Sequence, residues 1–255
     1  MVILPSGKRK GTGAISFADR PARSGVERAL VGFYSMVILS TTMRYAPGHN
    51  EAARDRIVDA ASRLFREEGI AAVGLAKIMS EADLTVGTFY THFKSKEALV
   101  RETLVRALKD RYIELEKALR AGDVELAVRA YLSPAHRDAP GLGCPTAALA
   151  SEVARHPRGT RQAFASESVL SLDLVADGLS KRSGGKRVSR ADAAAFFGLL
   201  AGTLQLARAT PDSAESDAIL EAGVRAALRL ASGDPEPSTR ARARRVSASS
   251  RTGSG

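Results

Sequence analysis

Hydrophobic residues recur at steps of three and four positions along much of this 255-residue chain, which is the spacing of one face of an α-helix. The segment 51–68 shows the pattern first. The apolar positions of this segment are Ala53, Ile57, Ala60, Ala61, Leu64 and Phe65. Gly69 follows, and glycine readily adopts the left-handed conformation that ends many helices. We therefore predict an amphipathic helix over 51–68 that ends at Gly69.

Two shorter helical segments follow the first one. The segment 75–82 has a helical apolar pattern, and Asp83 marks the turn after it. The next helix begins after Thr85, and Phe89 and Phe93 lie four positions apart, so both rings share its buried face. Two short helices joined by a tight turn are typical of the helix-turn-helix unit, whose second helix lies in the major groove of DNA.

The outer face of the helix after Thr85 carries small and hydroxyl-bearing residues. Thr85, Val86 and Thr88 are predicted to reach base edges, because hydroxyl groups bond to either class of base and methyl groups contact thymine. Gly87 lets the backbone approach the duplex closely. These residues make the segment a candidate DNA-reading helix.

The rest of the chain predicts further helices and no sheet. Aromatic residues make up only 5% of the chain and tryptophan is absent, which favours helix over strand. Ser95 is predicted to cap one helix and Ser189 another. The predicted later helices are 96–120, 123–132, 145–155, 158–181, 190–209 and 216–231, with a loop over 135–143. We predict an all-α chain with a three-helix DNA-binding domain at 43–98 and a helical domain at 99–232.

Two segments resemble the tetracycline-repressor-like (TetR) family of transcriptional regulators. They are RIVDAASRLFREEGI (56–70) and AKIMSEADLTVGTFYTHFKSKEAL (76–99). This chain departs from the family pattern at three positions, Gly74, Met79 and Asp83. The resemblance implies a helix-turn-helix domain followed by a helical ligand-binding and dimerisation domain. It also implies a ligand-responsive repressor that binds a palindromic operator as a dimer and leaves it when a small organic effector binds.

The resemblance also implies roles for individual residues. Tyr90, His92 and Lys96 match positions that contact phosphates, although His92 also suits a histidine that holds the turn to the next helix. The last two helices are expected to form a four-helix bundle with a second subunit. The expected bundle contacts are Phe196, Phe197, Gly198, Ala201 and Gly202. The expected lining of a largely apolar effector pocket is Leu108, Tyr112, Tyr131, Cys144 and Phe164.

The net charge of +10 comes mostly from the two ends of the chain. Residues 1–42 carry +4 and residues 233–255 carry +3, which leaves +3 for the region between them. The motif therefore indicates DNA binding more specifically than the charge does. We expect 1–42 to be a disordered extension or a mis-assigned start upstream of Met43, and 233–255 to be a disordered basic tail. The apolar run 29–39 is too short to span a bilayer.

Cys144 is the only cysteine, and with no export signal it predicts a reducing, cytoplasmic setting without a membrane partner. Its position before Pro145 would allow a reactive thiolate, but no Lys or Arg lies within four residues, which favours an ordinary helix-start residue. A helical enzyme using Cys144 is the main alternative, and a DNA-binding protein without an effector is another. Neither a catalytic set nor closely spaced metal ligands can be assembled, so we expect no catalysis, cofactor or metal.

Overall fold

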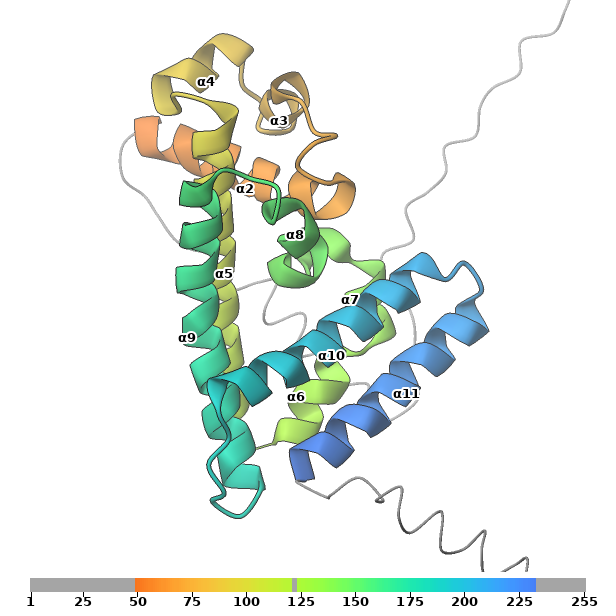
Figure 1. Cartoon of the computed structure of the whole chain (residues 1–255). Helices are drawn as coiled ribbons and strands as arrows, with labels where there is room; N and C mark the ends of the chain where they lie inside the picture. Colours follow the sequence, from red (N-terminus) through yellow and green to blue (C-terminus); the bar gives the residue numbers. More distant parts are fainter. Residues whose placement is uncertain (1–48, 121–122, 233–255) are drawn as a thin grey trace, which may run out of the picture. The chain divides into compact units, whose positions relative to one another are not determined.

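Every regular element in the part of the chain that the structure describes is a helix (Figure 1). The structure is a computed structural model, and it describes residues 49–120 and 123–232. The helices are α2 (His49–Glu68), α3 (Leu75–Glu81), α4 (Val86–His92), α5 (Lys96–Arg120), α6 (Val124–Tyr131), α7 (Pro134–Asp138), η2 (Pro140–Leu142), α8 (Pro145–Val153), α9 (Arg158–Arg182), α10 (Arg190–Ala209) and α11 (Ser213–Ser232). The predicted all-α class is confirmed. The predictions for 1–42 and 233–255 lie outside the described residues.

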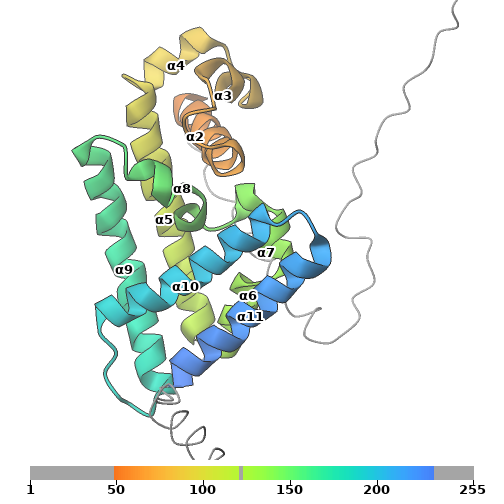
Figure 2. The same cartoon turned by 45° about the vertical axis from the view of Figure 1, so that its right-hand side comes forward.

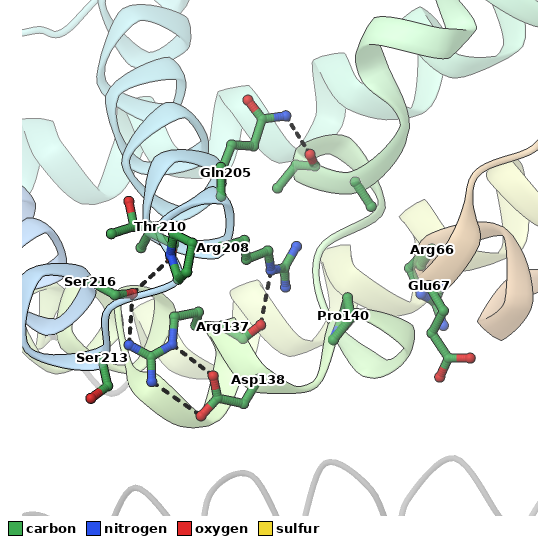
Figure 3. A pocket seen from close by; sticks show the side chains of 15 residues that line it. Arg66, Glu67, Arg137, Asp138, Pro140, Gln205, Arg208, Thr210, Ser213 and Ser216 are labelled. Carbon is green, nitrogen blue, oxygen red and sulfur yellow. Dashed lines mark hydrogen bonds and ion pairs between the residues drawn. The ribbon is translucent and has the colours of Figure 1, made fainter.

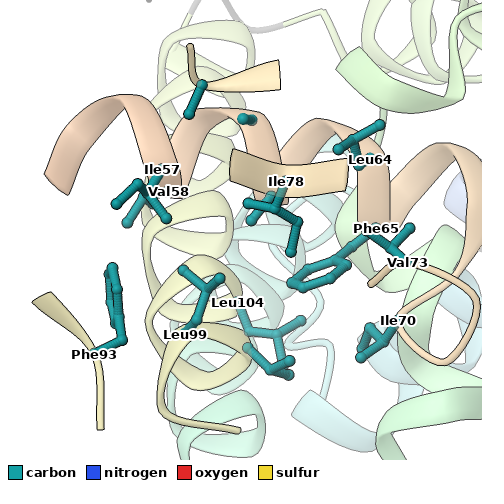
Figure 4. Packing of buried hydrophobic residues seen from close by; sticks show 14 of the residues in the cluster. Ile57, Val58, Leu64, Phe65, Ile70, Val73, Ile78, Phe93, Leu99 and Leu104 are labelled. Atoms are coloured by element: carbon teal, nitrogen blue, oxygen red, sulfur yellow. The ribbon is translucent and has the colours of Figure 1, made fainter. Parts of the chain in front are cut away.

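Helices α2, α3 and α4 pack with the first turns of α5 around one hydrophobic core (Figure 4). The Phe89 and Phe93 rings both point into this core and stack with their centroids 5.6 Å apart, as their spacing predicted. The other large, fully buried side chains of this core are Ile57, Val58, Phe65, Val73, Ile78, Met79, Leu99, Val100 and Leu104. The core thus fixes α4 with its apolar face inward.

Two residues in the left-handed region make the tight turns of this unit. Gly69 has φ +89° directly after α2, which confirms the predicted helix end. Asp83 has φ +52° in the turn between α3 and α4, a conformation that aspartate tolerates better than most residues. The tight turn thus forms with Asp83, one of the positions at which the chain departs from the family pattern.

Helices α5 and α9 lie side by side and run parallel (Figures 1 and 2). At their first turns, Glu97 accepts a hydrogen bond from the Thr160 hydroxyl and lies 3.0 Å from the His156 Nδ1. At their other ends, Gly178 faces Leu119, and an added Cβ at Gly178 would lie 3.1 Å from the Leu119 Cδ2. This pair joins the DNA-reading unit to the second helical domain.

Helices α10 and α11 form an antiparallel hairpin with a second core beneath it (Figure 2). Ser189 and Asp192 form a capping box at the start of α10, so the predicted cap is confirmed. Gly223 allows the close approach of the two helices, because an added Cβ would lie 2.4 Å from the Thr203 Cγ2. The core of this hairpin includes Phe196, Leu200, Leu204, Leu220, Val224 and Ala227.

The loop predicted over 135–143 was wrong. This segment forms α7 and the short 3₁₀ helix η2. The Ser133 hydroxyl accepts the backbone N–H of His136 at 3.2 Å, and Pro134 occupies the first turn. A serine followed by proline is a helix-start signal that outweighed the glycines further on. Helix α11 also begins earlier than predicted, because the Asp212 carboxylate caps it.

Replacing Gly69 by alanine should lower the free energy of unfolding by about 1–2 kcal/mol, because a side chain in the left-handed region is strained. The new Cβ would also lie 2.7 Å from the Glu152 Oε1. Gly159→Ala is the matched control. That glycine is the second residue of α9, and no atom lies closer than 3.9 Å to an added Cβ, so alanine should leave the free energy of unfolding unchanged or raise it by up to about 0.5 kcal/mol. Urea unfolding followed by circular dichroism measures both, and equal shifts would contradict the assignment.

Candidate functional site

The outer face of α4 is exposed and carries most of the predicted DNA-reading residues. Thr85, Val86, Gly87 and Tyr90 are exposed, and Val86 and Tyr90 have 43% and 65% of their surface open. Thr88 is half-buried, and its hydroxyl lies 3.0 Å from the Thr85 hydroxyl. Thr85 is the N-cap of α4, but its side chain makes no cap hydrogen bond. The Thr85 side chain is therefore not needed to start the helix.

Arginines of α2 fix the reading helix by contacts that the sequence pattern did not predict. Arg54 donates to the carbonyl of His92 at 2.7 Å, its Nε donates to Glu102 at 3.0 Å, and its guanidinium lies 4.4 Å from the Phe93 ring centre. Arg56 donates to the carbonyl of Ala82 at the preceding turn. The turn before α4 and the last residue of α4 are thus both tied to α2. Periodicity cannot reveal these contacts, because both arginines lie on the polar face of α2.

Lys96 and His92 are less exposed than most residues on the outer face of α4. The Lys96 Nζ donates to the carbonyl of Ile70 at 2.6 Å and lies 5.9 Å from the Phe65 ring centre. The ammonium that was expected to contact phosphate therefore binds the chain just after α2. His92 is half-buried at the end of α4. Tyr90 remains the most exposed of the three predicted phosphate contacts.

An apolar cavity of about 480 Å³ lies among α5, α6, α8, α9 and α10. Leu108, Tyr131, Cys144 and Phe164, four of the five residues expected at an effector pocket, line this cavity. Tyr112 was expected at this pocket but is not among the residues that line the cavity. Its other polar lining residues are Thr146, Ser168, Ser171 and Gln205.

The five residues expected at a subunit interface also border this cavity. Phe196 was assigned wrongly to the interface, because it is 7% exposed and packs inside its own chain. The Phe197 ring centre lies 5.8 Å from that of Tyr131. Gly198 is exposed and Gly202 is half-buried, and an added Cβ at either would meet no atom within 4 Å. The small residues of α10 therefore leave open space on that side.

A buried histidine holds the end of the cavity where α8 begins. The His136 Nδ1 donates to the carbonyl of Tyr131 at 2.7 Å, and its Nε2 accepts the backbone N–H of Cys144 at 3.0 Å. Burial, followed by the positive charge of Arg111, lowers the pKa of the imidazole to about 3. Neutral His136 therefore orients the backbone of Cys144 and does not face its thiol as a base.

Comparison with known proteins agrees with this arrangement. The family model "Bacterial regulatory proteins, tetR family" matches residues 57–103. The uncharacterised HTH-type transcriptional regulator YerO of Bacillus subtilis is 47% identical over 47 residues, which cover 18% of this chain and 16% of YerO. The structure of SCO4454, a TetR-family regulator from Streptomyces coelicolor, matches with a TM-score of 0.54 and 27% identity over 71% of this chain and 97% of that one. Residues 57–103 thus match the TetR family, and the described residues share the fold of a solved TetR-family regulator.

A further solved structure, of a transcriptional regulator, resembles the chain in fold alone. FadR from Bacillus subtilis, solved in complex with stearoyl-CoA, matches with a TM-score of 0.55 and 19% identity over 71% of this chain and 98% of that one. The chain spans only 16% of the length of its curated relative YerO. None of the helices within the described residues is long and apolar enough to cross a membrane.

His136→Gln should flatten the dependence of stability on pH between 6.5 and about 5. Folded His136 stays neutral down to a pKa of about 3, whereas the unfolded chain takes up a proton below the ordinary pKa of 6.5. The parent should therefore lose up to about 1.4 kcal/mol per pH unit through this group as the pH falls. Urea unfolding at several pH values measures the slope, and identical slopes in the two chains would contradict the buried neutral state.

Proposed function

We propose that this TetR-family regulator is a ligand-responsive repressor that binds an inverted-repeat operator as a homodimer. The observation that carries the proposal is the exposed outer face of α4, which is held from behind by the Phe89 and Phe93 core and by Arg54. A helix held rigidly in this way presents Thr85, Val86 and Gly87 together. Side chains of these types suit base edges and methyl groups in the major groove.

The second domain supports dimerisation through α10 and α11. Ala195, Gly198 and Leu206 are exposed on α10, and Ala222 and Leu230 are exposed on α11. Leu206 and Leu230 have 63% and 59% of their surface open. Small residues beside large apolar ones suit close packing of helices from a second copy. A two-fold dimer would place two reading helices in successive major grooves, about 34–36 Å apart.

The apolar cavity supports binding of a small organic effector. Its volume of about 480 Å³ is in the usual range for ligand sites, and its lining is mostly apolar. FadR, which shares this fold, was solved with stearoyl-CoA. Leu108 lines the cavity, and Leu104, one turn earlier on α5, packs in the DNA-reading core. A ligand that moves α5 would therefore also move α4, and could favour a dimer with wrongly spaced reading helices.

The alternative functions have less support. An enzyme using Cys144 would need a base beside the thiol, but the His136 Nε2 is already occupied by the backbone N–H of Cys144. Within residues 49–120 and 123–232, no group of three or more His, Cys, Asp or Glu is arranged to hold a metal ion. A DNA-binding protein without an effector would have no use for the apolar cavity.

Thr85→Ala should change base preference, whereas Tyr90→Phe should weaken binding to all sequences alike. The Thr85 hydroxyl is assigned to a base edge and makes no helix-cap bond, so its loss should cost about 1–3 kcal/mol at one base pair without unfolding α4. The Tyr90 hydroxyl is assigned to a phosphate, so its loss should cost about tenfold in affinity. Fluorescence anisotropy on the preferred duplex and its single-base variants measures both. Equal losses with unchanged preference would contradict the assigned roles.

Ala222→Glu should separate the dimer into monomers. Placing a charge in the proposed bundle brings two carboxylates near the two-fold axis and should cost about 3 kcal/mol or more. Ala165→Glu on the exposed part of α9 is the control and should leave the assembly unchanged. Sedimentation equilibrium reports the mass of each variant. A parent chain that is monomeric while binding the full inverted repeat would contradict the bundle.

A further inference from the structure

The wall of the apolar cavity contains a polar group that its own chain leaves without a hydrogen bond. This group is the hydroxyl of Tyr131, which is buried although the tyrosine as a whole is half-buried. Among the described residues, it is the one buried side-chain nitrogen or oxygen atom that has no hydrogen-bond partner. An unpaired buried hydroxyl costs free energy. In a cavity of ligand size, such a group marks the place where a bound molecule supplies the partner.

The Tyr131 ring is held in place at the end of the cavity where α8 begins. Its centroid lies 4.8 Å from that of His136 and 5.8 Å from that of Phe197, and both contacts are edge-to-face. The backbone carbonyl of Tyr131 also accepts the hydrogen bond from the His136 Nδ1. A ring packed by two neighbours presents its hydroxyl in one position. The hydroxyl is therefore positioned before a ligand binds.

The Cys144 thiol lies near the Tyr131 hydroxyl but is a poor substitute for an oxygen or nitrogen partner. Burial, followed by the nearby Cys144, raises the pKa of the Tyr131 phenol well above its usual value. The phenol therefore stays protonated at physiological pH and remains a hydrogen-bond donor. Sulfur accepts hydrogen bonds only weakly. Since a phenol donates more strongly than it accepts, the partner that fits this hydroxyl is an acceptor.

Two other polar residues of the cavity wall already have partners within the chain. The Ser168 hydroxyl donates to the carbonyl of Phe164 at 2.8 Å. Gln205, which also faces the neighbouring polar cleft drawn in Figure 3, donates from its amide to the carbonyl of Ala147 at 2.5 Å. The Tyr131 hydroxyl therefore differs from these two groups in having a hydrogen bond still to give.

The charge on the cavity wall is balanced within the chain. Arg111 is the one charged residue among the described residues that line the cavity, and it forms an ion pair with Glu114. A ligand carboxylate would be buried beside this neutralised pair, which costs more free energy than burying an uncharged group. Leu119 and Leu179 extend the apolar wall to the last turns of α5 and α9. The wall therefore suits an uncharged molecule.

We propose that the effector of this cavity is an uncharged, mostly apolar molecule with an acceptor oxygen, such as that of a ketone, ester or amide, which accepts a hydrogen bond from the Tyr131 hydroxyl. The apolar body of the ligand packs against the leucine, valine and phenylalanine side chains of the wall. This inference rests on the proposed effector-binding role of the cavity and specifies the chemistry of the ligand. The hydroxyl that is unpaired in the free chain gains its partner when the ligand binds.

Calorimetric titration of the full chain with three matched probes tests the proposal. The probes are butylbenzene, butyrophenone, in which a C=O group replaces one methylene group, and 4-phenylbutyrate, which is an anion of similar size. Tyr131→Phe should weaken the binding of butyrophenone about tenfold, because the ketone loses its donor, and should leave the binding of butylbenzene unchanged. The parent should bind 4-phenylbutyrate more weakly than butyrophenone, because Arg111 is already paired with Glu114.

Tyr112→Phe is the matched control, because it removes the same hydroxyl group from a tyrosine that does not line the cavity. Ser168→Ala removes a lining hydroxyl that is already bonded within the chain. Both control variants should bind all three probes as the parent does. Tyr131→Phe should keep the melting temperature of the parent, because it removes a hydroxyl that makes no hydrogen bond in the free chain.

The infrared spectrum of bound butyrophenone reports the hydrogen bond directly. A carbonyl that accepts a hydrogen bond vibrates at lower frequency than one in apolar surroundings. The C=O stretch should therefore lie lower in the parent than in Tyr131→Phe. A merely structural role of the Tyr131 hydroxyl would not shift this band, and it would lower the melting temperature of the variant.

The outcomes separate this inference from the proposed function. If Tyr131→Phe changes the binding of butyrophenone and butylbenzene equally, or leaves the C=O stretch unshifted, the inference is overturned and the cavity remains a ligand site. Tighter binding of 4-phenylbutyrate than of butyrophenone would overturn it in favour of an anionic effector. Failure of all three probes to bind would contradict both this inference and the effector role. Release of DNA by bound butyrophenone is a separate measurement that bears on the proposed function alone.

Discussion

Helix α5 is the constraint on which the rest of the structure depends, because it belongs to two hydrophobic assemblies at once. Leu99 and Leu104 are buried with the reading unit, whereas Leu108 and Leu115 border the apolar cavity. A continuous helix of 25 residues cannot shift at one part without displacing the other. The parallel partner α9 reinforces this link at Glu97 and Thr160. The DNA-reading surface and the cavity are therefore mechanically joined by packing.

Hydrogen bonds from arginine side chains help to fix the relative positions of the helices that hydrophobic packing brings together. Arg54 binds the last carbonyl of α4, Arg66 binds the carbonyl of Gly141, and Arg208 binds the carbonyl of His136. Each of these contacts joins elements that are far apart in sequence and satisfies a backbone acceptor at a helix end or turn. The helices thus gain fixed relative positions that their apolar faces alone would not specify.

The hydrophobic pattern of the sequence predicted most helices and their order correctly, but it did not reveal the long-range polar contacts. The bounds 96–120 and 190–209 agree with α5 and α10, because amphipathic spacing and serine caps are local signals. The helix in 135–143 was missed although Ser133 carried a local signal. Phe196 was placed at an interface because periodicity records that a face is buried and not which partner buries it. The Arg54 contact depends on tertiary approach, which no local pattern encodes.

The most direct test of the account is a hydroxyl-radical footprint of the full chain on duplexes selected from random DNA. If the exposed face of α4 reads DNA as part of a two-fold dimer, the protected region should show two symmetric half-sites. Their centres should lie about 10–10.5 base pairs apart or at a multiple of that spacing. Failure to select any preferred duplex, or protection of one unsymmetrical site, would contradict the account.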